Sequence, residues 1–205
     1  MSKKFLNSGI HTSSSRDFVK TLYMKWAETY DDEINENQYA TPTRIAEILR
    51  FNISNTDLRI LDYGCGTGLS GAALLQVGFN NLVGADSSKE MLSKAKGKNI
   101  YQSLIELNLD TTNPISKGDY PIIIGSGLIG PGAASIELFD TIMSKLDIGG
   151  KFVFSLNDAA LSIPAYSAKL NNYIRRGKVR LRFKGYGPHL PGINLKAMIY
   201  ILEKK

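Results

Sequence analysis

The sequence predicts an α/β fold with a mostly parallel sheet, and two segments carry that prediction. The first is Leu58-Arg-Ile-Leu-Asp-Tyr-Gly-Cys-Gly-Thr-Gly68, where a short apolar strand runs into alternating glycines and then into a helix that Gly78 ends. The second is the run 81–86, a further strand that finishes on an acid eighteen residues after Gly68. A strand, a glycine turn, a helix and a second strand are typical of a parallel sheet that binds a nucleoside-containing ligand beside the turn.

The glycine spacing fits two kinds of cofactor. Gly66-x-Gly68-x-x-Gly71 satisfies the dinucleotide fingerprint, but the strand before it would then have to include Gly64. If the turn starts at Gly64 instead, the strand is sound and Asp62 lies just inside its carboxyl end. A carboxylate there suits a ligand with a cationic amino-acid group better than a pyrophosphate. The sequence therefore favours S-adenosylmethionine (SAM) over NAD.

Length and composition suit one α/β domain of 205 residues with a full-sized core. Apolar residues make up 43% and charged residues 21%, as in ordinary globular proteins. Cys65 is the only cysteine, which excludes a disulfide framework and a multi-cysteine metal site. No apolar run approaches membrane-spanning length, and no hydrophobic stretch follows Lys3 and Lys4. We therefore expect a single cytoplasmic domain over 1–205, without metal or membrane association and of undetermined oligomeric state.

Basic residues concentrate at the C-terminal end. Residues 159–205 hold ten Lys or Arg and one acid, in a chain whose net charge is +6. Such a segment could attract nucleic acid or an anionic substrate. Lys178, Arg180, Arg182 and Lys184 alternate with apolar residues, however, so that the charges share one face of a half-buried strand. The alternation favours a solvated face, and we expect no nucleic-acid partner.

The first forty residues are predicted to form a helical lid. Phe18, Leu22, Trp26 and Tyr30 recur at helical spacing, and the last two immediately precede an acidic turn. The stripe could simply face a core, as we expect for its first two members. Trp26 and Tyr30 are large amphipathic rings that could instead cover a ligand. The next helix is predicted to start at Thr41 as N-cap, followed by a proline at its first position.

Acids at the ends of the second and third strands are candidates for cofactor binding. Asp86 could accept hydrogen bonds from both ribose hydroxyls, and Met91 lies in the first turn of the helix that follows. Asp110 follows a third predicted strand within 103–108 and could accept from an adenine amino group. For Met91 a packing role, and for Asp110 a turn role, stays equally open. Further strands are expected at 120–125, 151–156, 178–184 and 195–202.

Two loops are expected beside the ligand. The segment 126–132 follows the fourth strand at the carboxyl edge, where such sheets bind ligands. The Gly/Pro-rich segment 185–192 is predicted as a loop between the last two strands, and it carries His189. His189 is a weak candidate for a general base, since a loop histidine is more often a plain surface residue.

These motifs resemble class I SAM-dependent methyltransferases. Ile60-Leu-Asp-Tyr-Gly-Cys-Gly-Thr-Gly68 and Val83-Gly-Ala-Asp-Ser-Ser-Lys-Glu-Met91 look like motif I with its companion acid, and Gly149-Gly-Lys-Phe-Val-Phe-Ser-Leu-Asn-Asp158 resembles the family's fifth-strand segment. Trp26-Ala-Glu-Thr-Tyr-Asp31, the Tyr39-x-x-Pro42 pair and Lys98-Asn-Ile-Tyr-Gln102 resemble a narrower, small-molecule-type branch that includes the Williams–Beuren syndrome region methyltransferase.

The resemblance implies a Rossmann-like, seven-stranded, mostly parallel sheet with helices on both faces and an antiparallel last strand. It implies that Asp62, Gly64 and Gly66 hold the methionine end of SAM and that Asp86 holds the ribose. Further implied contacts to SAM or its lid come from Trp26, Tyr30, Ser87, Met91, Leu109, Asp110 and Ser126. Tyr39 would belong to the wall of the substrate pocket.

The predicted activity is methyl transfer from SAM to a small molecule by in-line displacement. The sulfonium leaves as a neutral thioether, so positioning is the main requirement, and a base is needed only if the acceptor must lose a proton. We expect the two ends of the chain to form the acceptor pocket, with Tyr39 from one end and Tyr186 and His189 from the other. Two alternatives stay open: an RNA or protein methyltransferase that uses the basic C-terminal face, and a SAM-binding protein without transfer activity.

Overall fold

The computed structural model describes residues 28–108 and 114–205. Its strands are β1 (Ile60–Tyr63), β2 (Leu82–Asp86), β3 (Ser103–Glu106), β4 (Ile122–Gly125), β5 (Lys151–Asn157), β6 (Val179–Leu190) and β7 (Leu195–Lys204). Its helices are α2 (Tyr30–Glu36), α3 (Thr41–Asn52), α4 (Leu69–Gln76), α5 (Lys89–Gly97), α6 (Leu138–Lys145), α7 (Asp158–Leu161) and α8 (Pro164–Arg175), with a 3-10 turn at Pro191–Ile193. Within these ranges no helix is both long enough and apolar enough to span a bilayer.

The strands form one seven-stranded sheet in the order β3-β2-β1-β4-β5-β7-β6. The first five strands pair in parallel. The last strand, β7, runs antiparallel to both of its neighbours, so that β6 has the same direction as β5. The predicted Rossmann-like architecture is therefore confirmed, including the antiparallel last strand. The strand order reverses next to β1, and in open parallel sheets ligands bind at such a point.

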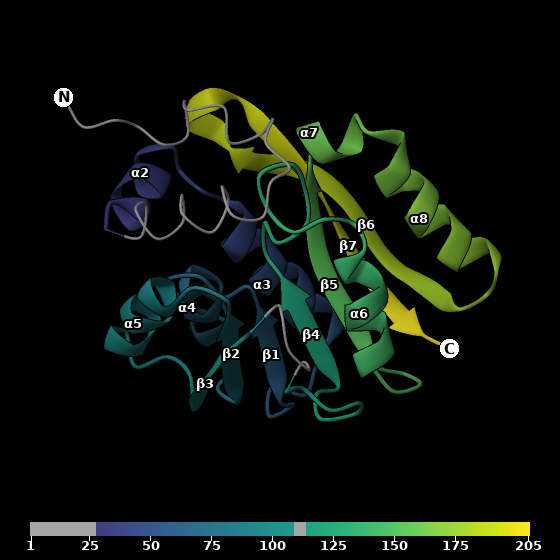
Figure 1. The fold of residues 1–205 in the computed structure, drawn as a ribbon, viewed down its shortest axis with the longest axis horizontal. Coiled ribbons are helices and arrows are strands. Elements are labelled where there is room, and N and C mark those ends of the chain that lie inside the picture. Colours follow the sequence, from purple (N-terminus) through teal and green to yellow (C-terminus); the bar gives the residue numbers. More distant parts are fainter. Residues whose placement is uncertain (1–27, 109–113) are drawn as a thin grey trace.

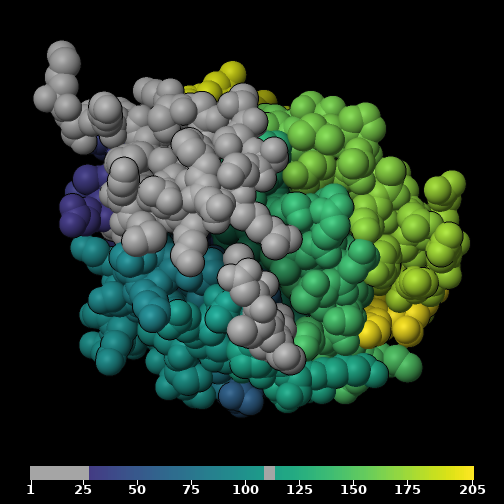
Figure 2. All heavy atoms as spheres, in the orientation of Figure 1, coloured from purple at the N-terminus to yellow at the C-terminus, as the bar shows by residue number. Residues whose placement is uncertain are grey.

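Helices cover both faces of the sheet (Figure 1). On one face α3 and α4 contribute buried apolar residues to a core that includes Ile60 of β1 and Ile122 of β4. On the other face α6 and α8 pack against Leu61 of β1 and the phenylalanines of β5. In space-filling form the segment from α6 to α8 (green) covers one side of the molecule, beside the teal half that holds α4 and α5 (Figure 2).

Two local predictions were wrong. The segment 185–192 is not a loop, because β6 continues to Leu190 and pairs with β7 over that length. Its proline, Pro188, is tolerated since β6 is the edge strand of the sheet. Thr41 is not the N-cap of α3, because Ala40 holds that position without a side-chain bond, while the Thr41 hydroxyl hydrogen-bonds His189.

The tip of the β6–β7 hairpin packs against the segment that links α2 to α3. The Ala40 backbone N–H donates to the carbonyl of His189 (2.9 Å), and the Gly192 N–H donates to the carbonyl of Asn37 (3.2 Å). Leu190 and Ile34 are buried together in a small apolar cluster at the same place. The N-terminal part of the described chain and the C-terminal hairpin therefore meet at the carboxyl edge of the parallel strands.

Candidate active site

The glycine turn between β1 and α4 forms the floor of the site. Gly64, Gly66 and Gly68 all have positive φ, at 73°, 53° and 96°. A side chain on Gly64 would collide with Leu128, its Cβ lying 2.5 Å from Leu128 Cδ1. A Cβ on Gly66 would meet no atom of residues 28–108 or 114–205 within 4 Å. The backbone at Gly66 is thus open, and a ligand can approach it as closely as the predicted cofactor site requires.

Asp86 ties the end of β2 to this turn. Its Oδ2 accepts from the Gly66 backbone N–H at 2.8 Å, and its Oδ1 accepts from the Ser88 N–H at 2.9 Å. Burial raises the pKa of Asp86, and the backbone N–H groups of Ser88, Gly66 and Ser87 oppose that shift. Each carboxylate oxygen can accept more than one hydrogen bond. The carboxylate therefore still has acceptor capacity for the hydroxyls of a ligand.

Asp62 lies beneath the turn and is fully buried. Its Oδ2 accepts from Ser70 Oγ (2.5 Å) and from Tyr101 Oη (2.6 Å), whereas its Oδ1 has no hydrogen-bond partner among the described residues. Burial raises the pKa of Asp62 to about 6, against the opposing hydrogen bonds from Ser70 and Tyr101. Asp62 itself is not among the lining residues of the pocket, and its carboxylate lies behind Ser70, which is one of them.

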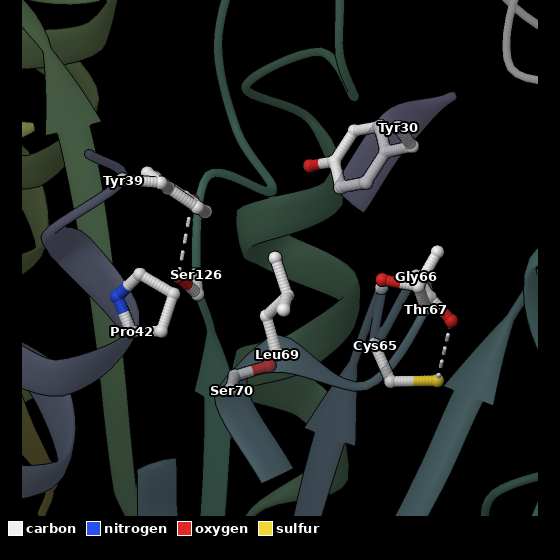
Figure 3. Close-up of a pocket in the computed structure, with 10 residues that line it drawn as sticks. Tyr30, Tyr39, Pro42, Cys65, Gly66, Thr67, Leu69, Ser70 and Ser126 are labelled. Carbon is white, nitrogen blue, oxygen red and sulfur yellow. Dashed lines mark hydrogen bonds between the residues drawn. The ribbon is translucent and has the colours of Figure 1, made fainter. Parts of the chain in front are cut away.

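Helix α2 covers the turn and is attached to it by Asp31. Thr67 Oγ1 donates to Asp31 Oδ1 at 2.5 Å, and Lys98 Nζ lies 2.6 Å from Asp31 Oδ2. Tyr30, the first residue of α2, points into the space above the turn (Figure 3). One acid of α2 thus joins three segments of the chain at the entrance to the site.

Tyr39 forms the opposite wall, beside the end of β4. Its hydroxyl lies 3.2 Å from Ser126 Oγ (Figure 3), and a Cβ on Gly127 would come within 2.7 Å of that hydroxyl. Burial raises the pKa of Tyr39 to about 12, so its hydroxyl stays protonated at neutral pH. Behind it, the His189 ring packs edge-on at 5.1 Å between centroids, and His189 Nδ1 hydrogen-bonds Thr41 Oγ1 at 2.7 Å.

These groups enclose a pocket to which the described part of the chain contributes no charged side chain. It is lined by Tyr30, Tyr39, Pro42, Gly64, Cys65, Gly66, Thr67, Leu69, Ser70 and Ser126. Tyr39 and Ser126 lie on one side of the pocket, Tyr30 and Thr67 lie on the other, and Leu69 lies between them (Figure 3).

Comparison with known proteins identifies this arrangement. A family model described as "Methyltransferase domain" matches residues 60–146, the segment from β1 to the end of α6. Residues 60–146 thus match a methyltransferase domain. One similar structure is magnesium protoporphyrin IX methyltransferase of Synechocystis, which was crystallised with bound SAM. Its TM-score is 0.64 at 17% sequence identity, and the alignment covers 100% of this chain and 92% of that protein. A Thermotoga maritima protein described as a possible histamine N-methyltransferase also has a TM-score of 0.64, at 13% identity over 91% and 99% of the two chains. At these identities the likeness concerns the fold.

Curated relatives of the methyltransferase domain differ in their stated acceptors. Human methyltransferase-like protein 27 is 31% identical over 114 residues, which are 54% of this chain and 46% of that protein. The Saccharomyces cerevisiae 18S rRNA (guanine(1575)-N(7))-methyltransferase is 30% identical over 56% of this chain and 46% of its own length. The ribosomal protein L11 methyltransferase of Cellvibrio japonicus is 32% identical over 55% and 37%. The chain spans less than half the length of these relatives.

The fold brings together part of the predicted site. Tyr30, Tyr39, Gly64, Gly66 and Ser126 line one pocket. Ser87 is exposed beside Asp86, and Met91 is buried with its N–H capped by Ser88, the observed N-cap of α5. Trp26, Leu109 and Asp110 lie outside the described residues, and their roles stay predictions.

Two residues of the predicted acceptor pocket lie elsewhere than expected. His189 is on β6 rather than in a loop, and it is buried behind Tyr39. Tyr186 is 53% exposed, its hydroxyl donates to Asp158 Oδ1 at 2.6 Å, and it is not part of the pocket lining. Pairing of β6 with β7 explains both positions, because it fixes the directions of these side chains, whereas a loop would have left them free to turn toward the site.

Sequence reasoning missed Thr67, Ser70 and Tyr101. Ser70 lies eight residues after Asp62, in the first turn of the helix after the glycines, and this spacing could have indicated their contact. Thr67 lies within the turn itself and faces α2. No local pattern marks the contact of Tyr101 with Asp62, because 39 residues separate them.

The first prediction concerns the stability cost of the Asp62 charge. The pKa of Asp62 is about 6 in the folded protein, above its ordinary 3.8, so the folded state binds more protons between these values. Protonation of Asp62 therefore stabilises the folded state fully below about pH 4, and this stabilisation is lost as the pH rises through 6. In the wild type, the free energy of unfolding should therefore fall by about 3 kcal/mol between pH 4 and 7. Asp62→Asn should remove this decrease, as measured by urea unfolding of the ligand-free protein. Asp147→Asn, at an exposed carboxylate, should keep the wild-type pH dependence; identical curves for the two variants would contradict the assignment.

The second prediction concerns the attachment of α2. Asp31→Ala removes the acceptor that Thr67 and Lys98 share, so α2 should leave the turn more readily. Because the Asp31 and Lys98 side chains are about one-third exposed, we expect about 1 kcal/mol, or a roughly fivefold faster dissociation of S-adenosylhomocysteine. Stopped-flow displacement measures this rate. The neighbouring Asp32→Ala is the control, and equal rates in the two variants would refute the role of Asp31.

Proposed function

We propose that this protein transfers a methyl group from SAM to a small organic acceptor by in-line displacement. The observation that carries the proposal is the pocket between the glycine turn and Tyr39, whose lining among residues 28–108 and 114–205 has no charged side chain. Apolar and aromatic walls with a few polar groups are typical of sites for small ligands. A site for a nucleic-acid strand would instead call for cationic side chains that meet phosphates.

The described residues fit the cofactor. Gly66 leaves its backbone open, Asp86 has spare acceptor capacity for ribose hydroxyls, and Asp62 places a carboxylate behind the pocket wall for a cationic group. Ser87 and Met91 are proposed to flank the adenine. Bound SAM supplies a methyl group activated by its sulfonium.

Tyr39 and Ser126 are proposed to orient the acceptor at the end of β4. The raised pKa of Tyr39, about 12, keeps its hydroxyl a hydrogen-bond donor and excludes it as a base at neutral pH. His189 is proposed to hold the Tyr39 ring in place from behind, rather than to take a proton itself. The chain's contribution is then mainly to hold the acceptor in line with the methyl group.

We further propose that residues 1–40 act as a lid over this site, within one domain of 205 residues. The attachment of Asp31 to Thr67 supports this, as does the packing of Leu190 and Ile34 between the hairpin tip and α2. A lid of this kind would exclude water from the reaction and open for product release.

An RNA or protein acceptor is the alternative, and relatives whose names state rRNA and ribosomal protein keep it open. One observation disfavours the basic strand as the surface for such an acceptor. Arg180 and Arg182 both pair with Glu203, opposite Lys151 at the amino end of β5, whereas the glycine turn lies at the carboxyl end. We therefore favour the small-molecule-type branch that the Trp26-to-Asp31 and Tyr39-x-x-Pro42 segments resemble.

The test is to incubate methyl-labelled SAM with three separate host fractions: small metabolites, RNA and protein. We expect label in a low-mass product of the metabolite fraction by mass spectrometry. Label only in RNA or protein would overturn the choice of acceptor. Binding of S-adenosylhomocysteine by calorimetry without label transfer to any fraction would instead indicate a SAM-binding protein without transfer activity.

A further inference from the structure

Tyr101 reaches Asp62 through space that two glycines leave free. It belongs to the link between α5 and β3, and its hydroxyl donates to Asp62 Oδ2 at 2.6 Å. A Cβ on Gly71 of α4 would lie 2.5 Å from Tyr101 Oη, and a Cβ on Gly84 of β2 would lie 3.2 Å from Tyr101 Cδ2. Neither glycine has a positive φ, so the backbone conformation does not require them. Since glycine weakens helix interiors, Gly71 is explained by the access it gives to the tyrosine, whereas a Cβ at Gly84 would meet Leu104 and Cys65 before Tyr101.

The groups around Asp62 lack a positive charge. Ser70 and the Gly71 N–H approach it from α4, Tyr101 approaches it from the α5–β3 link, and the nearby Asp86 carboxylate from β2 repels its charge. Burial raises the pKa of Tyr101 and of Cys65 in the turn, so both stay neutral. Among the described groups that shift the pKa of Asp62, none is a cation. A buried carboxylate is ordinarily balanced by a positive charge.

We infer that Tyr101 is a positioning residue of the cofactor site, which holds Asp62 as a carboxylate facing the cationic amino-acid end of SAM. This inference rests on the proposed function. Tyr101 is not among the residues that line the pocket, and it would act through Asp62, whose other donor, Ser70, lines the pocket. Its hydroxyl favours the ionised carboxylate, because a hydrogen bond to the charged form opposes the effect of burial.

Loss of the Tyr101 hydroxyl should affect the affinities of two ligands that share the nucleoside differently. S-adenosylhomocysteine carries the amino-acid end, whereas 5′-methylthioadenosine lacks it. Tyr101→Phe keeps the ring that fills the space at Gly71 and Gly84 and removes only the hydroxyl. We expect the pH at which S-adenosylhomocysteine affinity declines to rise by about one unit. By calorimetry, affinity should fall roughly fivefold at pH 6 and about twofold at pH 7, and it should match wild type at pH 8.5.

The controls distinguish positioning from a structural role. Affinity for 5′-methylthioadenosine should be the same in Tyr101→Phe and wild type at each pH, because the nucleoside contacts are unchanged. Tyr120→Phe, at a buried tyrosine before the amino end of β4, should leave both ligands unaffected. Equal weakening of both ligands by Tyr101→Phe, or no pH shift for S-adenosylhomocysteine, would overturn the inference.

The wild-type protein gives an independent measurement that does not depend on the folding of a variant. The ratio of the two affinities should decline as the pH falls through about 6, the pKa of Asp62, and a constant ratio would overturn the inference. If wild type binds neither ligand at any pH, the proposed function fails. If it binds both with a constant ratio, only the role of Tyr101 and Asp62 fails.

Discussion

Gly66→Val should abolish the binding of S-adenosylhomocysteine and leave the domain folded. A Cβ at this position would meet no atom of the described residues within 4 Å, and it would project where the cofactor is expected to approach the backbone. The protein itself bears only the strain of a branched residue at a φ of 53°, about 1–2 kcal/mol. Calorimetry should therefore detect no ligand binding, while circular dichroism still shows a cooperative thermal transition.

Gly149→Val is a closely matched control for this change. Gly149 also has a positive φ, 82°, and open space around its missing Cβ, but it lies before the amino end of β5, at the opposite edge of the sheet. The two variants should lose similar stability, and only the variant at Gly66 should lose the ligand. Binding retained by Gly66→Val, or lost equally by both variants, would refute the location of the cofactor.

Asp86→Ala should weaken S-adenosylhomocysteine at least about tenfold. A hydrogen bond to a charged acceptor is worth roughly 1.5–3 kcal/mol, and the ribose is expected to make such bonds. The change also leaves the N–H groups of Gly66 and Ser88 without their acceptor, so the turn itself should become less ordered. Calorimetry gives the affinity, and thermal unfolding gives the accompanying loss of stability.

Asp158→Ala serves as the comparison for Asp86→Ala. Both acids lie at the carboxyl end of a strand, because Asp86 is the last residue of β2 and Asp158 directly follows β5. Asp158 accepts hydrogen bonds from the Lys196 backbone N–H and from the Tyr186 hydroxyl. It should cost stability without changing ligand affinity, since β4 separates β5 from β1 and its glycine turn in the sheet. If both variants lose affinity to the same degree, the effect of Asp86 is structural and its contact with the ribose is refuted.

Much of the fold follows from local patterns. The apolar run before Gly64 predicts β1, and the glycines with positive φ at 64, 66 and 68 are where the pattern expects a turn. Gly78 and Gly177 end α4 and α8 with positive φ, as expected for helix C-termini. The hairpin was the exception, because Gly and Pro at 185–188 indicate a loop while pairing with β7 keeps them in a strand. Tertiary hydrogen bonds along an edge strand outweighed the local signal.

Local sequence was sufficient to predict the glycine turn, the acid at the end of β2 and the order of strands and helices, because each depends on neighbouring residues and on a regular period. The distant side chains that complete the candidate site become apparent only in the folded chain. Asp31 meets Thr67, Tyr101 reaches Asp62 and His189 packs behind Tyr39 across separations of 36, 39 and 150 residues. Such contacts arise when a sheet aligns the carboxyl ends of its parallel strands and when glycines leave room for a particular ring. Neither condition is expressed in the spacing of residues along the chain.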